Sequence, residues 1–90
     1  MRKIIGLIMT KRFERSFEKL DRAIKRSFMD RKNLLLADSR HPMLNLHKLQ
    51  GKFEGYWSMN ITGDVRLIFK MEGFIAIMID IGRHSTLFGN

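Results

Sequence analysis

Length, composition and charge exclude several classes of protein. The 90-residue chain is 44% apolar and has no cysteine, so it can bury one core but holds no disulfide, thiolate zinc site or cysteine nucleophile. Its formal net charge is +8. No apolar run approaches the roughly 20 residues of a membrane-spanning helix, and the basic start MRKIIGLIM lacks a cleavage site. We expect one domain over residues 1–90, cytoplasmic and without a membrane partner.

Positive charge is concentrated in the first third of the chain. Residues 1–32 hold 11 of the 17 basic residues and 4 of the 9 acidic ones, a net charge of +7. A basic surface of this density favours a polyanion or an acidic protein as partner, bound in a salt-sensitive manner. A solvated helix surface without a partner explains the same charges and stays open.

The first half of the chain predicts a strand and two helices. Residues 2–9 are rich in Ile and Leu and predict a strand buried on both faces. Thr10 and Asp21 are candidate N-caps, so we expect a helical hairpin over about residues 10–38. The apolar positions of the hairpin recur at helical spacing and predict the side that faces a core: Phe13, Phe17, Leu20, Ile24 and Phe28. His41 precedes Pro42, which favours extended backbone and ends the hairpin.

The second half changes to a period of two residues. The runs YWSMNIT, VRLIFKM and FIAIMIDI are separated by the turns GD and EG, which predicts a three-stranded antiparallel meander. The last run is apolar on both faces and is therefore expected inside the sheet. Together the elements predict an α+β fold: a small antiparallel sheet, made of the N-terminal strand and the C-terminal three-stranded meander, packed on a helical hairpin.

Alternation divides the meander into two faces. The side chains expected to face the helices are Trp57, Met59, Ile61, Val65, Leu67 and Phe69. The side chains expected on the opposite face are Tyr56, Ser58, Asn60, Arg66 and Lys70. We interpret this opposite face as a polar, basic surface that does not form a core.

Two histidines lie where the predicted strands begin and end. His47 precedes the meander and His84 follows its last strand, so both can reach the edge of the polar face. Two imidazoles beside Arg66 suit RNA cleavage through the ribose 2′-hydroxyl, in which one group removes a proton, another returns one and the arginine stabilises charge on phosphorus.

Simpler interpretations of these residues stay open. Histidines in loops are often surface residues, and Arg66 can be held by Asp64 or Asp80 in a structural ion pair. Phe88 near the chain end can be core packing rather than a base-stacking platform. The three histidines have no ligand-like spacing, so a metal site is not expected.

The second half also resembles a known family. The stretches LHKLQGKFEGYWSMNITGDVRLIFK and IDIGRHSTLFG are similar to the RelE/ParE superfamily of bacterial toxins, nearest to its YafQ-like and YoeB-like branches. The HxLxG loop at residues 47–51, the GY pair at 55–56, Asp64, LIFK at 67–70 and the final GRHSTLF match the YafQ-like branch. GYWS and the arginine of RLIF match the YoeB-like branch. The similarity covers about residues 45–89, whereas the first half agrees in element order and basic character.

This resemblance implies an mRNA interferase with a RelE-like fold. Such a type II toxin cleaves mRNA in the ribosomal A site without a metal or cofactor and is neutralised by a cognate antitoxin. By position, the resemblance implies four catalytic residues: His84, Arg66, His47 and Asp64. The residues expected to contact RNA are Phe88, Lys70, Tyr56, Lys52 and Arg83. The residues expected to contact ribosomal RNA are Lys11, Arg12, Arg15, Lys19, Lys25 and Arg26.

One departure from the family pattern keeps alternatives open. The YafQ-like branch has a histidine on the second strand where this chain has Asn60, and an amide does not exchange protons near neutral pH. A catalytically weak RNA-binding toxin homologue is therefore one alternative. A ParE-like toxin that inhibits DNA gyrase by binding is another, although it should lack the histidine and arginine set.

Overall fold

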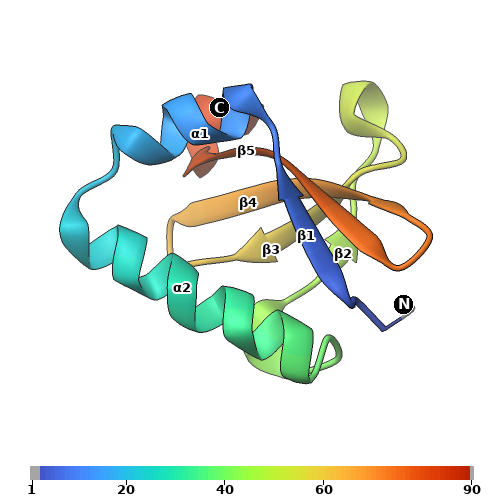
Figure 1. Cartoon of the computed structure of the whole chain (residues 1–90). Coiled ribbons are helices and arrows are strands. Elements are labelled where there is room, and N and C mark those ends of the chain that lie inside the picture. Colours follow the sequence, from blue (N-terminus) through green and yellow to red (C-terminus); the bar gives the residue numbers. More distant parts are fainter. Residues whose placement is uncertain (1–2, 90) are drawn as a thin grey trace.

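The computed structural model describes residues 3–89 and has an α+β fold with a five-stranded mixed sheet (Figure 1). The strands are β1 (Gly6–Met9), β2 (His47–Lys48), β3 (Trp57–Asn60), β4 (Val65–Glu72) and β5 (Ile75–Arg83), in the spatial order β1-β5-β4-β3-β2. The helices are α1 (Lys11–Glu18), α2 (Arg22–Ala37) and α3 (His84–Phe88), with short 3₁₀ turns η1 (Pro42–Leu44) and η2 (Gly51–Phe53). Within residues 3–89, no helix combines the length and apolar character needed to cross a bilayer.

The predicted helical hairpin is confirmed as α1 and α2. The Thr10 hydroxyl accepts a hydrogen bond from the Phe13 N–H (3.1 Å), and the Asp21 carboxylate accepts one from the Ile24 N–H (2.9 Å). Both N-caps therefore satisfy backbone donors that the first helical turn leaves without partners. Asp21 thus separates the two helices where the sequence predicted the break.

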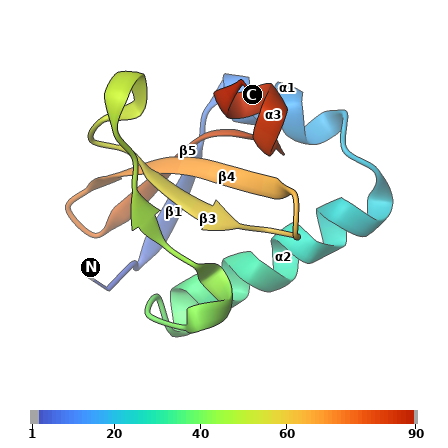
Figure 2. The same cartoon turned by 180° about the vertical axis from the view of Figure 1, so that it is seen from behind.

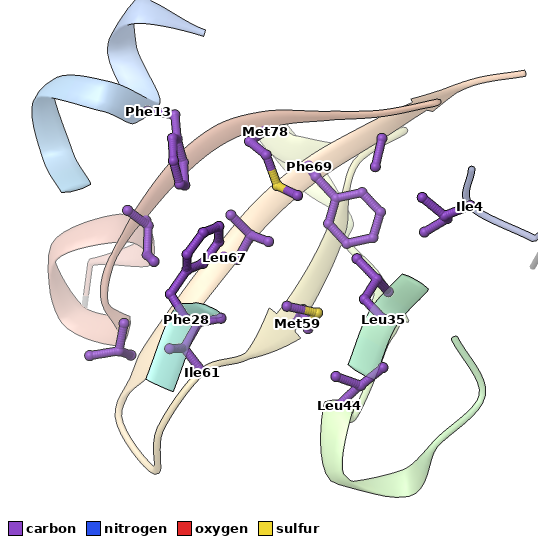
Figure 3. Packing of buried hydrophobic residues seen from close by; sticks show 13 residues of the cluster. Ile4, Phe13, Phe28, Leu35, Leu44, Met59, Ile61, Leu67, Phe69 and Met78 are labelled. Atoms are coloured by element: carbon purple, nitrogen blue, oxygen red, sulfur yellow. The ribbon is translucent and has the colours of Figure 1, made fainter. Parts of the chain in front are cut away.

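The core lies between the helices and one face of the sheet (Figure 3). Phe13 of α1 and Phe28 of α2 are buried, and with Phe17 their ring centroids lie 5.2 to 5.6 Å apart. These aromatic contacts join the two helices to each other. The sheet residues predicted to face the helices are buried in the same cluster, with Trp57 partly buried against it: Met59, Ile61, Val65, Leu67 and Phe69. That half of the alternation prediction is confirmed.

The opposite face is only partly the open surface that the sequence predicted. Ser58 and Ile68 are buried there, and the chain end folds back against β4 and β5 as α3. Leu87 of α3 lies over Gly82, where an added Cβ would stand 3.6 Å from the leucine side chain. This distance is an ordinary van der Waals contact, so α3 packs on the sheet at Gly82 and covers part of the polar surface.

Two predictions about β1 are wrong. It runs parallel to β5, with Gly6 opposite Ile75, so the sheet is mixed rather than antiparallel. Periodicity identifies a strand but not its direction, and a crossover through two helices allows parallel pairing. As an edge strand, β1 also leaves Ile8 and Met9 exposed instead of burying both faces. The predicted strand began at residue 2, which lies outside the described residues.

The meander is confirmed as β3, β4 and β5, and β5 lies between two other strands as predicted. Its pairing with β4 contains one irregularity. Ile68 pairs with Asp80 and Phe69 pairs with Met78, so Ile79 is an extra residue in β5. Such a bulge reverses which face the following side chains point to. Ile81 consequently enters the core and Asp80 points to the opposite face.

Candidate functional site

A hollow of about 260 Å³ lies on the polar face of the sheet, between β2, the β3–β4 pair and α3. We call it the site hollow. Figure 2 shows β2 and α3 on the near side of the molecule, with the sheet behind them. The site hollow is lined by Asn45, His47, Leu49, Ser58, Arg66, His84 and Phe88. The structure therefore brings together three of the four residues predicted to be catalytic and the predicted terminal aromatic residue.

Strand β4 supplies Arg66, which is half-buried and has no carboxylate partner among the described residues. Its Nη1 donates to the carbonyl oxygens of Thr62 (3.2 Å) and Gly63 (3.1 Å) in the β3–β4 turn. A guanidinium has five N–H donors, so this arrangement leaves Nε and Nη2 available to an anion in the hollow. The side chain is tethered by neutral groups and its positive charge is not neutralised.

The two aspartates considered as partners for Arg66 are paired with other arginines. Asp80 is 8% exposed, and its Oδ2 accepts a hydrogen bond from Nε of Arg12 in α1 (3.2 Å) and lies 3.1 Å from Nη2 of the same guanidinium. Asp64 is exposed and pairs with Arg83 at 3.0 Å. A structural ion pair for Arg66, left open by the sequence, is therefore not formed with either carboxylate.

Strand β2 supplies His47, whose Nδ1 lies 2.9 Å from the carbonyl oxygen of Asn45. A carbonyl oxygen only accepts hydrogen bonds, so Nδ1 carries the proton and Nε2 of the neutral ring is an acceptor. Asn45 adopts the left-handed conformation (φ 46°, ψ 47°), which asparagine tolerates better than most residues. This local turn thus gives His47 the tautomer required of a base acting through Nε2.

His84 is the first residue of α3, directly after β5. Its N–H donates to the Asp64 carbonyl oxygen at 2.9 Å, which fixes the chain at the end of the sheet. The His84 ring lies 4.9 Å from the Phe88 ring, centroid to centroid, and Phe88 meets Phe53 of η2 edge-on at 5.6 Å. This aromatic row holds His84 against one wall of the site hollow.

Other residues predicted from the resemblance lie outside the site hollow. Asp64 contributes its main-chain oxygen to the start of α3 rather than a carboxylate to the hollow. Arg83 is exposed beside Asp64, Lys70 lies 3.7 Å from Glu72, and the Lys52 Nζ stands 5.3 Å from the Phe53 ring centroid. The Tyr56 ring also packs on Phe53, with centroids 6.3 Å apart.

The six hairpin residues predicted to contact ribosomal RNA form two groups. Lys11, Arg15, Lys19 and Arg26 are exposed. Arg12 is engaged with Asp80, and the Lys25 Nζ stands 5.6 Å from the Phe17 ring centroid. The first group is available to a polyanion, whereas Arg12 also fastens α1 to β5.

Three residues of the site hollow are not among the predicted site residues: Asn45, Leu49 and Ser58, of which the alternation pattern assigned only Ser58 to the polar face. Asn45 follows the proline turn η1, and an asparagine at that point is a signal for left-handed backbone. Leu49 belongs to the HxLxG match at residues 47–51, but its apolar side chain gives no chemical signal of a site. Asn60 faces Arg66 across β3 and β4 and has a buried Oδ1 without a hydrogen-bond partner among the described residues.

The arrangement can bind an anion and move protons on two sides of it. Arg66 offers positive charge, His47 offers an acceptor nitrogen, and His84 offers a second imidazole at the opposite wall. Within residues 3–89, no group of three His, Cys, Asp or Glu side chains is arranged to hold a metal ion. A phosphodiester of single-stranded RNA fits these groups, because its phosphate is charged and its ribose 2′-hydroxyl is a nucleophile.

Comparison with known proteins finds a matching family model. The family model described as the bacterial toxin of type II toxin–antitoxin systems, YafQ, matches residues 6–89. YafQ from E. coli strain BL21(DE3) is 21% identical, with a TM-score of 0.75 over 92% of this chain and 97% of that one. A search of curated proteins finds no match.

Two further solved structures share this fold. The E. coli DinJ–YafQ toxin–antitoxin complex contains a chain 21% identical to this one, with a TM-score of 0.73 over 98% of this chain and 100% of that chain. The YoeB/ParE toxin from Agrobacterium tumefaciens is 23% identical, with a TM-score of 0.66 over 89% of this chain and 99% of that one. The family model confirms the resemblance to YafQ-like toxins, and the solved structures confirm the fold that this resemblance implied.

The hydrogen bond of His47 makes a direct prediction. When the imidazole rings are neutral, their ¹H–¹⁵N correlation spectra should show His47 protonated on Nδ1. His41 is an internal control, because its Nδ1 accepts from the Met43 N–H at 3.1 Å and must carry its proton on Nε2. The two rings should therefore appear as opposite tautomers. The same tautomer at both positions would contradict the assignment of His47 Nε2 as an acceptor.

Proposed function

Because the chain belongs to the YafQ family of bacterial toxins of type II toxin–antitoxin systems, we propose that it is a ribosome-dependent mRNA endoribonuclease neutralised by a cognate antitoxin. The observation that carries this proposal is the convergence of His47, Arg66 and His84 on one hollow. The E. coli relative forms a complex with DinJ, which supports an antitoxin partner here. Because the proposed substrate is mRNA under translation, we expect the protein to act in the cytoplasm.

The proposed reaction is a transesterification within the RNA strand. His47 Nε2 removes the proton of a ribose 2′-hydroxyl, and the 2′-oxygen attacks the adjacent phosphorus. The bond from phosphorus to the 5′-oxygen breaks while protonated His84 donates a proton to that oxygen. The products are a 2′,3′-cyclic phosphate and a free 5′-hydroxyl. Imidazoles carry out both proton transfers, so the proposed reaction needs no metal ion.

Arg66 stabilises the charge that develops on the phosphate. Its Nε and Nη2 donors are not used by the described residues, whereas Nη1 holds the side chain on the β3–β4 turn. A preorganised donor of this kind acts where charge appears and needs little rearrangement. Since Asn60 cannot transfer protons, Arg66 and the two histidines carry the reaction in this chain.

Asp64 and Phe88 support the catalytic side chains. The Asp64 carbonyl oxygen anchors His84 through its N–H, and the carboxylate holds Arg83 close by. We assign Asp64 a positioning role rather than proton transfer. Phe88 lines the hollow beside His84 and offers a ring on which a base can stack.

Cleavage tests the proposed catalytic residues. mRNA 5′ ends are mapped in an in vitro translation reaction containing the wild-type chain or one variant. We expect discrete cuts in the ribosomal A site, slowed about 100-fold or more in His47→Ala and His84→Ala, because general acid–base catalysis contributes at least that much. Arg66→Ala should lose a similar factor, with partial recovery in Arg66→Lys.

The controls are Ser85→Ala and Arg22→Ala, which remove exposed side chains of α3 and α2 outside the site hollow. Both should cut like the wild type. Full cleavage by His84→Ala would contradict the proposal. A wild-type chain that leaves mRNA intact yet arrests growth with DNA-damage signalling would favour the gyrase inhibitor instead. A wild-type chain that binds RNA without cutting or arresting growth would favour the weak RNA-binding homologue.

Ribosome docking tests the role of the hairpin. Reversing charge at Lys11, Arg15 and Lys19 should weaken ribosome binding and reduce the slope of log K against log salt concentration by about two units or more. These three side chains are exposed, whereas Arg12 is kept because it fastens α1 to Asp80. Lys3→Glu, outside both helices, is the control. An unchanged slope in the triple variant would exclude the hairpin as the docking surface.

A further inference from the structure

Two further hollows lie beside the site hollow, around the edge strand β2. One, of about 570 Å³, is lined in part by Lys48, and we call it the Lys48 hollow. The other, of about 460 Å³, is lined in part by Arg40, and we call it the Arg40 hollow. Trp57 lines both of them. Each also shares a residue with the site hollow, Leu49 for the Lys48 hollow and Asn45 for the Arg40 hollow.

The direction of the β2 side chains explains this arrangement. His47 pairs with Ser58 and Lys48 pairs with Trp57 across β2 and β3. Successive side chains of a strand point to opposite faces, so His47 enters the site hollow while Lys48 and Trp57 share the other face. A chain that leaves the site hollow over the short edge strand therefore reaches Trp57 directly.

The chemistry of these hollows suits a nucleotide. Trp57 is half-buried, packs partly against the core and presents the rest of its indole to the two hollows. The Lys48 Nζ lies over the indole ring, 5.6 Å from its centroid, and a lysine that turns from the ring to a phosphate leaves this face of the indole to a base. Arg40 offers positive charge in the Arg40 hollow, which Trp57 also lines. Glu54 also lines the Lys48 hollow, and its carboxylate disfavours a phosphate deep inside it.

We propose that Trp57 and Lys48 form a second RNA subsite, which holds a base of the same mRNA strand next to the cleaved phosphate. The inference rests on the proposed function, because the strand is the one that the site hollow cleaves. Two observations select RNA as the occupant. The hollows share lining residues with the site hollow, and the charges at Lys48 and Arg40 complement a polyanion in a chain of net charge +8.

The test uses the fluorescence of Trp57, which is the only tryptophan of the chain and so reports on this subsite alone. The probe is a single-stranded oligodeoxynucleotide of six nucleotides, which has no 2′-hydroxyl and cannot be cleaved by the proposed reaction. Base stacking should quench Trp57 as the hexamer is added at low salt, and quenching should weaken as salt is raised.

Variants are compared by the anisotropy of a fluorescein-labelled hexamer. Trp57→Ala should weaken binding by about fivefold or more, and Trp57→Phe by less, because a smaller ring stacks over less area. Trp57→Phe keeps an aromatic ring against the core, and thermal unfolding identifies any variant that fails to fold. Lys48→Glu should weaken binding, whereas the matched Lys32→Glu on α2 should not.

Trp57 fluorescence that ignores the hexamer would overturn the subsite, as would a folded Trp57→Ala chain that binds the hexamer like the wild type. A wild-type chain that does not bind the hexamer at low salt would also overturn it. If that chain still cuts mRNA, the proposed function stands without the subsite. If the hexamer quenches Trp57 but the wild-type chain does not cut mRNA, the proposed cleavage is wrong and the RNA subsite at Trp57 is supported.

Discussion

The pairing of β4 with β5 determines how Arg66 on β4 and His84 after β5 lie relative to each other. One extra residue, Ile79, reverses the alternation of β5 between Met78 and Asp80. Without it, the Asp80 carboxylate would point into the apolar core and Ile81 would leave it, which costs free energy on both counts. With it, Gly82 lies opposite Arg66, and α3 starts where the His84 N–H meets the Asp64 carbonyl oxygen. The bulge thus places the end of the chain on the polar face.

Among the described residues, the ion pairs around the site leave Arg66 without a carboxylate. Asp80 is held by Arg12, and Asp64 is held by Arg83, so neither neutralises Arg66. A half-buried guanidinium tethered by neutral carbonyl oxygens keeps its positive charge and its attraction for a phosphate. Arg12 meanwhile joins α1 to β5, so the ion pair that fastens the basic hairpin to the sheet also removes a competitor for Arg66.

Periodicity and caps predicted the parts of the fold that depend on local sequence. The hairpin, its N-caps at Thr10 and Asp21, and the meander follow from helical spacing, capping chemistry and alternation. The parallel pairing of β1 and the two-residue strand β2 depend on distant partners, which periodicity does not record. Within the site, the two histidines and Arg66 could be predicted, because their residue types indicate proton transfer and phosphate binding. The bulge and the burial of Ser58 arise only from the assembled sheet, whereas the turn at Asn45 has a local signal in the asparagine that follows the proline turn.

The chemical ends of the cleaved RNA test the central claim most directly. The fragments made in a translation reaction are treated with a phosphatase and with a cyclic-phosphate hydrolase, and their ends are identified by mass spectrometry. Cleavage by His47, Arg66 and His84 through the ribose 2′-hydroxyl predicts a 2′,3′-cyclic phosphate, or the 3′-phosphate formed from it, on the upstream fragment and a 5′-hydroxyl on the downstream one. A 3′-hydroxyl paired with a 5′-phosphate would contradict this account, because water rather than the 2′-oxygen would then be the nucleophile.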